Sequence, residues 1–192
     1  KSFDLLLYPL AYKDNPKFRG IILRRTVPQL TEHGALWDES QQMYRDLGAT
    51  QNQTRLEHQF PSGAKLRLGH MEHEKDRFNF DSAQFAFIGI DQAEHFTGRQ
   101  VYYLISRMRT MSGIKTELRL TFNPPDPNLA PAGQYLFELF APWVDSKFPN
   151  PAQDGEVRYM IRVENTIKWV DENTPDRMSV TFIRASVYDN QI

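Results

Sequence analysis

The run Phe85–Asp91 (FAFIGID) most constrains what this chain folds into, because every position before the last is apolar or Gly. A continuous apolar run of this length predicts a strand buried on both faces, as in a parallel sheet. The run ends in a carboxylate, Asp91. Ligands of open parallel sheets bind beyond the carboxyl ends of the strands, so the run predicts Asp91 at a binding edge.

Strand-like and helix-like patterns alternate over the first 125 residues. Strands are predicted at 20–26 and 118–123, and helices at 3–11, 36–47 and from about residue 98. Pro9 is expected to shorten the first helix. Alternating residues on both sides of Pro61-Ser62-Gly63 predict a β-hairpin. The alternation predicts an α/β fold, a mainly parallel sheet with helices on both faces and an added hairpin.

The last quarter of the chain follows a different pattern. Residues 145–156 contain three Pro or Gly residues and several polar ones, which predicts a linker, and a short helix is expected just before them. Three further strands are predicted at 158–163, 166–170 and 178–183. The sequence therefore predicts a core over 1–144 and a small lid or linker region over 145–192.

Composition excludes several classes of protein. The chain has no Cys, which excludes disulfide scaffolds and thiolate metal sites and fits a reducing compartment. No apolar run approaches the roughly 20 residues that span a bilayer, and the pattern of a secretory signal peptide is not seen, so no membrane partner is predicted. Lys+Arg 23 and Asp+Glu 24 nearly cancel, so any basic surface must be local.

Three places could carry chemistry. Asp91 could serve Mg²⁺ as the strand-terminal carboxylate of P-loop NTPases does, or it could cap the next helix. Thr121 and Asn123 could sense a phosphate or hold a water, or they could form a turn before two prolines. Lys1-Ser2 directly precede a helix, as the end of a G-x-x-x-x-G-K-[ST] phosphate loop does. The chain begins without Met, so we expect a fragment cut at both ends.

Taken in order, these segments resemble the ATPase domain of the large terminase subunit of tailed bacteriophages, the motor that packages DNA into a procapsid. The resemblance covers nearly the whole chain. It rests on Lys1-Ser2, Arg24-Arg25-Thr26, Phe60–Ala64, Gly69-His70, Ser82–Phe96 (SAQFAFIGIDQAEHF), Leu104–Arg109, Thr121–Pro124, Thr181–Ala185 and Tyr188–Asn190. The joint order of these segments carries the resemblance.

The resemblance implies a P-loop NTPase-like, RecA-like fold lacking most of its phosphate loop, with ATP and Mg²⁺ as cofactors. It implies that Lys1 contacts the β- and γ-phosphates and that Ser2 and Asp91 serve the magnesium. Thr121 and Asn123 would couple the phosphate state to DNA movement. The arginine that stabilises the transition state, in cis or from a neighbouring subunit, would be one of Arg24, Arg25, Arg107 and Arg109.

The sequence departs from the family at one position. The family usually places Glu directly after the strand-terminal Asp, but this chain has Gln92. A neutral amide can hydrogen-bond the attacking water but cannot take its proton. Either Glu94 supplies the carboxylate, which is our hypothesis, or hydrolysis is impaired.

The resemblance implies an ATPase motor that packages double-stranded DNA, with partners that include the portal or procapsid and the small terminase subunit. It implies a homo-oligomeric ring in the host bacterial cytoplasm, transiently at the portal. No nuclease activity is expected for this fragment. The alternatives are a helicase-like P-loop motor and a nucleotide-binding or structural module that does not hydrolyse ATP, which Gln92 favours.

Overall fold

A computed structural model describes residues 2–109 and 113–185 of the chain. The chain divides into two compact units, Lys1–Gly133 and Gln134–Ile192. Each unit has its own sheet. Among the described residues, no helix combines the length and the apolar character needed to cross a membrane.

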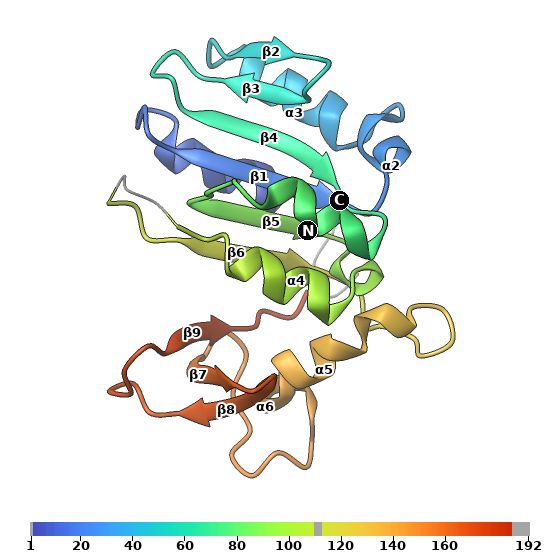
Figure 1. The fold of residues 1–192 in the computed structure, drawn as a ribbon, viewed down its shortest axis with the longest axis vertical. Helices are drawn as coiled ribbons and strands as arrows, with labels where there is room; N and C mark the ends of the chain where they lie inside the picture. Colours follow the sequence, from blue (N-terminus) through green and yellow to red (C-terminus); the bar gives the residue numbers. More distant parts are fainter. Residues whose placement is uncertain (1, 110–112, 186–192) are drawn as a thin grey trace. The chain divides into compact units, whose positions relative to one another are not determined.

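The first unit is built on a six-stranded mixed sheet in the order β2-β3-β4-β1-β5-β6 (Figure 1). Its strands are β1 (Arg19–Arg24), β2 (Thr50–Asn52), β3 (Glu57–Gln59), β4 (Lys65–His70), β5 (Phe87–Asp91) and β6 (Glu117–Thr121). Strands β4, β1, β5 and β6 are parallel, and β2 and β3 add antiparallel pairs at one edge. The predicted α/β class, the mainly parallel sheet and the β3–β4 hairpin are confirmed.

Helices cover both faces of this sheet (Figure 1). Helices α1 (Ser2–Leu7) and α3 (Leu36–Arg45) share a buried cluster with Ile22 and Phe87, which project from one face of β1 and β5. The 3-10 helix η2 (Glu74–Phe80) and helix α4 (Gly98–Ile105) lie on the other face. All five residues of β5 are buried because both of its faces are covered.

Two prolines shape local elements of the first unit. Helix α1 ends at Leu7, and the chain continues as the 3-10 helix η1 (Tyr8–Tyr12), as the position of Pro9 predicts. Strand β1 ends at Arg24, and an unpredicted short helix α2 (Val27–Thr31) follows with Pro28 in its first turn. Proline is well tolerated there because the first helical N–H groups have no partner within the helix.

The second unit holds α5 (Tyr135–Leu139), α6 (Ala141–Val144) and an antiparallel sheet in the order β8-β7-β9. The 3-10 helix η4 (Pro131–Gln134) precedes them. The strands are β7 (Val157–Val163), β8 (Thr166–Val170) and β9 (Met178–Thr181). All three strands were predicted within a few residues.

The unit boundary lies between residues 133 and 134, earlier than the predicted boundary after residue 144. Rings of the short helices explain the difference. Phe140 packs on Phe182 with ring centroids 5.2 Å apart, and Trp143 packs on Trp169 at 5.7 Å. Helices α5 and α6 therefore share a core with the C-terminal strands, and the stretch that was predicted as a linker lies inside the second unit.

The hairpin strand β3 carries a buried histidine into the core of the first unit. His58 is fully buried and packs between the rings of Trp37 and Tyr44. The Ser40 hydroxyl donates to the carbonyl of Trp37 at 2.7 Å, so it accepts from His58 Nε2 at 2.8 Å. Nδ1 then carries the lone pair, and it is buried with no hydrogen-bond partner among the described residues. Burial lowers the pKa of His58 from 6.5 to about 4.

Acidification is therefore expected to destabilise the first unit through His58. Between pH 6.5 and 4 the unfolded chain binds a proton at this imidazole that the folded chain does not, so stability falls as the pH falls. The loss between pH 7.5 and 5 is about 2 kcal/mol. Urea unfolding of the wild type and His58→Gln at both pH values measures it. The exposed His33 gives the control His33→Gln; an unchanged pH dependence in His58→Gln would contradict the assignment.

Candidate active site at the carboxyl edge of the sheet

Three neighbouring parallel strands end at one edge of the first unit's sheet with polar residues. Arg24 ends β1, Asp91 ends β5 and Thr121 ends β6. The register pairs Asp91 with Thr121, and Leu23, just before Arg24, with Ile90. The parallel register therefore brings the three side chains to one place, as expected for the ligand-binding edge of such a sheet.

Asp91 is the centre of this cluster. It is 2% exposed, and both of its carboxylate oxygens accept hydrogen bonds. The Ser2 hydroxyl, at the start of α1, lies 3.0 Å from Oδ1 and 2.9 Å from Oδ2. The Thr121 hydroxyl donates to Oδ1. The structure thus joins three of the predicted site residues through one buried carboxylate.

Arg24 neutralises this carboxylate. Its Nε and Nη2 lie 2.7 Å and 2.6 Å from Asp91 Oδ2, and its Nη1 donates to the carbonyl of Gln29 at 2.6 Å. Its side chain is only 17% exposed. Burial of a charge is costly without a partner of opposite sign, so Arg24 and Asp91 stabilise each other in place.

The chain turns sharply directly after Asp91. Gln92 has φ 56° and ψ 51°, in the left-handed region that residues with a side chain adopt rarely, and the 3-10 helix η3 (Ala93–His95) follows. Strain of this kind concentrates at functional sites. The turn buries the Gln92 Oε1 atom, which has no hydrogen-bond partner among the described residues.

Glu94 returns to the sheet edge as a buried carboxylate. The residue is 6% exposed, and its Oε1 accepts from Asn123 Nδ2 at 3.2 Å. Its Oε2 is buried and has no hydrogen-bond partner within the described part of the chain. One oxygen of this buried carboxylate is hydrogen-bonded and the other is not. Such a group can act as a general base or can position a water molecule.

Gly133 packs closely against the backbone of Glu94. The sequence did not predict this contact. A Cβ added to Gly133 would lie 2.6 Å from the Glu94 carbonyl oxygen and 2.8 Å from its Cα. Only glycine allows so close an approach to backbone atoms. No pattern around Gly133 could have revealed this, because the contact joins two segments that are far apart in the sequence.

The remaining predicted arginines lie elsewhere. Arg25 binds the Gln100 side chain and the Met71 carbonyl, at 2.9 and 3.2 Å. Arg107 and Arg109 flank Met108, which pairs with Phe85 beyond the amino end of β5. Six residues of extended chain separate Phe85 from Asp91, about 20 Å. The structure therefore does not bring Arg107 or Arg109 to Asp91 within one chain; a role from a neighbouring subunit stays a prediction.

Lys1, the predicted phosphate-binding residue, lies outside the described residues, as do Tyr188–Asn190 of the resemblance. Among residues 2–109 and 113–185, no group of three or more His, Cys, Asp or Glu side chains is placed to hold a metal ion. Magnesium in nucleotide hydrolases is commonly held by one or two carboxylates with phosphates and waters. The Asp91 carboxylate with the Ser2 hydroxyl fits that donor set.

Neither a protein-family model nor a curated protein matches this sequence.

Proposed function

We propose that this chain is the ATPase domain of a terminase large subunit, a P-loop NTPase-like motor of the RecA-like class that packages double-stranded DNA. The observation that carries the proposal is the Asp91 carboxylate, buried and bonded to both the Ser2 and Thr121 hydroxyls. A helix-start hydroxyl beside a strand-terminal carboxylate is the pair that serves magnesium in P-loop NTPases.

In this proposal each residue of the edge has a separate task. Ser2 and Asp91 hold the magnesium, which when bound neutralises charge on the ATP phosphates. Glu94 Oε2 takes or orients the proton of the attacking water, and Asn123 holds the Glu94 side chain through Oε1. The Thr121 hydroxyl bonds Asp91 and ends β6, so a change of the nucleotide that shifts Asp91 also shifts the end of that strand.

Arg24 has the task of orienting the Asp91 carboxylate and balancing its charge. Its guanidinium lies against the same Oδ2 that the Ser2 hydroxyl contacts. The proposed partners are those of a packaging motor: double-stranded DNA, the portal or procapsid, the small terminase subunit and further copies of this chain in a ring. The proposed location is the bacterial host cytoplasm.

A second candidate function is nucleotide binding without hydrolysis. Gln92 favours it, because the residue after the strand-terminal Asp cannot take a proton. The buried Glu94 carboxylate favours hydrolysis instead. A helicase-like motor would share the same edge and differ in its response to DNA.

The decisive experiment measures phosphate release from Mg-ATP by the longer protein that the resemblance implies, including the residues before Lys1. We expect hydrolysis that blunt linear double-stranded DNA stimulates and that chelation of magnesium abolishes. ATP binding without turnover would support the non-hydrolysing module. Stimulation by single-stranded DNA alone would support a helicase-like motor, and no binding of ATP would contradict all three.

A further inference from the structure

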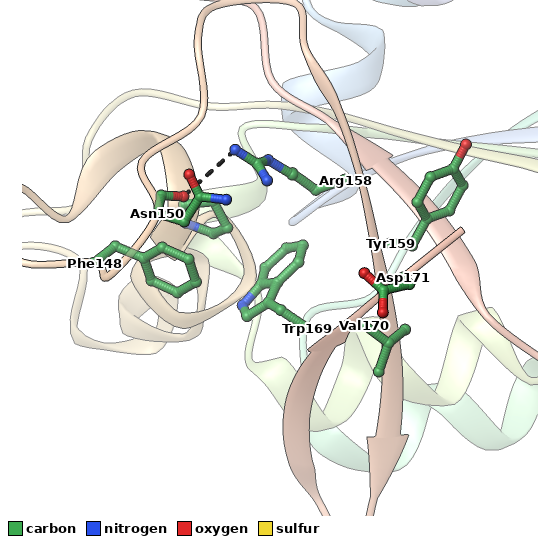
Figure 2. A pocket seen from close by; sticks show the side chains of 8 residues that line it. Phe148, Asn150, Arg158, Tyr159, Trp169, Val170 and Asp171 are labelled. Atoms are coloured by element: carbon green, nitrogen blue, oxygen red, sulfur yellow. Dashed lines mark hydrogen bonds between the residues drawn. The ribbon is translucent and has the colours of Figure 1, made fainter. Parts of the chain in front are cut away.

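The second unit contains a cavity of about 240 Å³ (Figure 2). Rings of Pro142, Phe148 and Trp169 and polar side chains of Asn150, Arg158 and Asp171 contribute to its lining. Pockets for drug-sized ligands measure about 300–1,000 Å³. The smaller volume fits a single flat ring system rather than a whole nucleotide.

The strand register places the main groups of the cavity on one side of the sheet. Trp169 pairs with Met160, and Val170 pairs with Tyr159. Because side chains alternate along a strand, Arg158, Trp169 and Asp171 project from the same face. Continuing the antiparallel register by one position sets Asp171 opposite Arg158, so a cation and an anion face each other beside Trp169. Figure 2 shows the Trp169 indole between Phe148 and Asp171 in that view, with Arg158 extending toward Asn150.

The polar groups of the cavity are incompletely satisfied by the protein. Arg158 Nε is buried and has no hydrogen-bond partner in the described part of the chain. The Arg158 guanidinium pairs with Glu156 at 3.0 Å and makes long contacts of 3.5 and 3.4 Å to the carbonyls of Asn150 and Pro151. These contacts all use Nη2, and a ligand in the cavity would accept from the guanidinium and donate to the exposed Asp171 carboxylate. Asp171 is exposed at the rim of the cavity.

We propose that this cavity binds one nucleobase and prefers guanine. Guanine carries acceptors at O6 and N7, which arginine commonly contacts, beside donors at N1 and N2 that a carboxylate accepts. Its flat ring stacks on Trp169, as bases do on aromatic side chains in nucleic-acid-binding proteins. Adenine offers a carboxylate only one amino group next to its acceptors, and pyrimidines stack over a smaller area.

This inference stands apart from the proposed ATPase, because every residue it uses lies in the second unit. The guanine has two possible sources, a free guanine nucleotide or an unpaired base of a nucleic-acid strand. A free nucleotide and an unpaired base present the same edge of the guanine ring to the protein. They differ only in what is attached to the sugar.

The test titrates the 192-residue chain with GMP and with AMP and follows the indole N–H signals of its three Trp residues by NMR. Trp169→Phe identifies the Trp169 signal. GMP is expected to shift that signal, with a dissociation constant at least about tenfold lower than that of AMP, because guanine makes a further hydrogen bond to a charged group. The two nucleotides share their phosphate, so the difference reports the base.

Two variants and a matched control locate the binding. Asp171→Asn and Arg158→Lys are each expected to weaken GMP binding about tenfold or more. Glu172→Gln removes the same charge at the next, exposed position, which does not line the cavity, and it is expected to change nothing. Unchanged thermal unfolding of each variant establishes that the fold is kept.

The proposal is overturned if millimolar GMP leaves the Trp169 signal unmoved, if AMP binds as tightly as GMP, or if Asp171→Asn binds GMP like the wild type. A thymidine oligonucleotide with one central guanine identifies the source. Tighter binding of the oligonucleotide than of GMP assigns the base to a strand, and tighter binding of GMP assigns it to a free nucleotide; either result supports a guanine site.

Discussion

Glu94→Gln is expected to lower the rate of ATP hydrolysis at least about a hundredfold while ATP binding is retained. The reason lies in the two carboxylate oxygens of this buried residue. Oε1 accepts from the Asn123 amide, and the carbonyl oxygen of a glutamine can keep that bond. Oε2, which has no partner among the described residues, becomes an amide nitrogen and can no longer take a proton. Single-turnover phosphate release and equilibrium binding of a labelled nucleotide separate the two effects.

Two further variants make this result specific. Glu72→Gln makes the same chemical change at an exposed position and is expected to leave the rate unchanged. Gln92→Ala removes the amide that stands at the family's usual Glu position, and it is expected to lower the rate less than Glu94→Gln does. Full activity in Glu94→Gln or Glu94→Ala, or a larger loss in Gln92→Ala, is incompatible with Glu94 as the catalytic carboxylate.

Asp91→Asn is expected to lower the free energy of unfolding by about 3 kcal/mol, in addition to its effect on activity. The substitution leaves the Arg24 guanidinium, whose side chain is 17% exposed, without a partner of opposite charge. Breaking a buried ion pair from one side is strongly destabilising because the remaining charge stays desolvated. Urea denaturation at neutral pH measures the change.

The double variant Arg24→Met/Asp91→Asn tests whether the charge left behind is the cause. It is expected to be more stable than Asp91→Asn alone, because the unpaired cation is gone. Asp4→Asn supplies a surface comparison, since Asp4 is 60% exposed and pairs with Arg119 at 2.9 Å. That loss should be within about 1 kcal/mol. Equal losses in the free energy of unfolding in Asp4→Asn and Asp91→Asn would show that the buried Arg24–Asp91 pair stabilises the fold no more than a surface pair does.

Local patterns predicted much of the fold. The apolar run at 85–91 formed the buried strand β5, the residues around Pro61-Ser62-Gly63 formed the hairpin, and Pro9 ended the first helix. Each of these features depends on residues close together in the sequence. The short edge strand β2 was missed because Thr50–Asn52 has no apolar alternation, and pairing with β3 stabilises it.

The sequence predicted several residues of the candidate site but not how they contact one another. Strand ends pointed to Asp91, Thr121 and Asn123, because parallel strands carry their terminal residues to one edge. Four arginines remained equivalent in the sequence. The strand order separated them by placing Arg24 on Asp91 and Arg107 and Arg109 at the far end of β5.

Local sequence patterns were enough to identify most of the strands and helices and the polar residues at the strand ends, since apolar periodicity, prolines and strand-terminal polar residues act over short stretches of chain. Which side chains meet depends on the folded arrangement: the Arg24–Asp91 pair joins positions 67 residues apart, and the left-handed turn at Gln92 precedes Glu94, which is buried beside Asn123. Such contacts depend on strand order, register and packing, and these arise from the simultaneous burial of many distant residues, which no local pattern encodes.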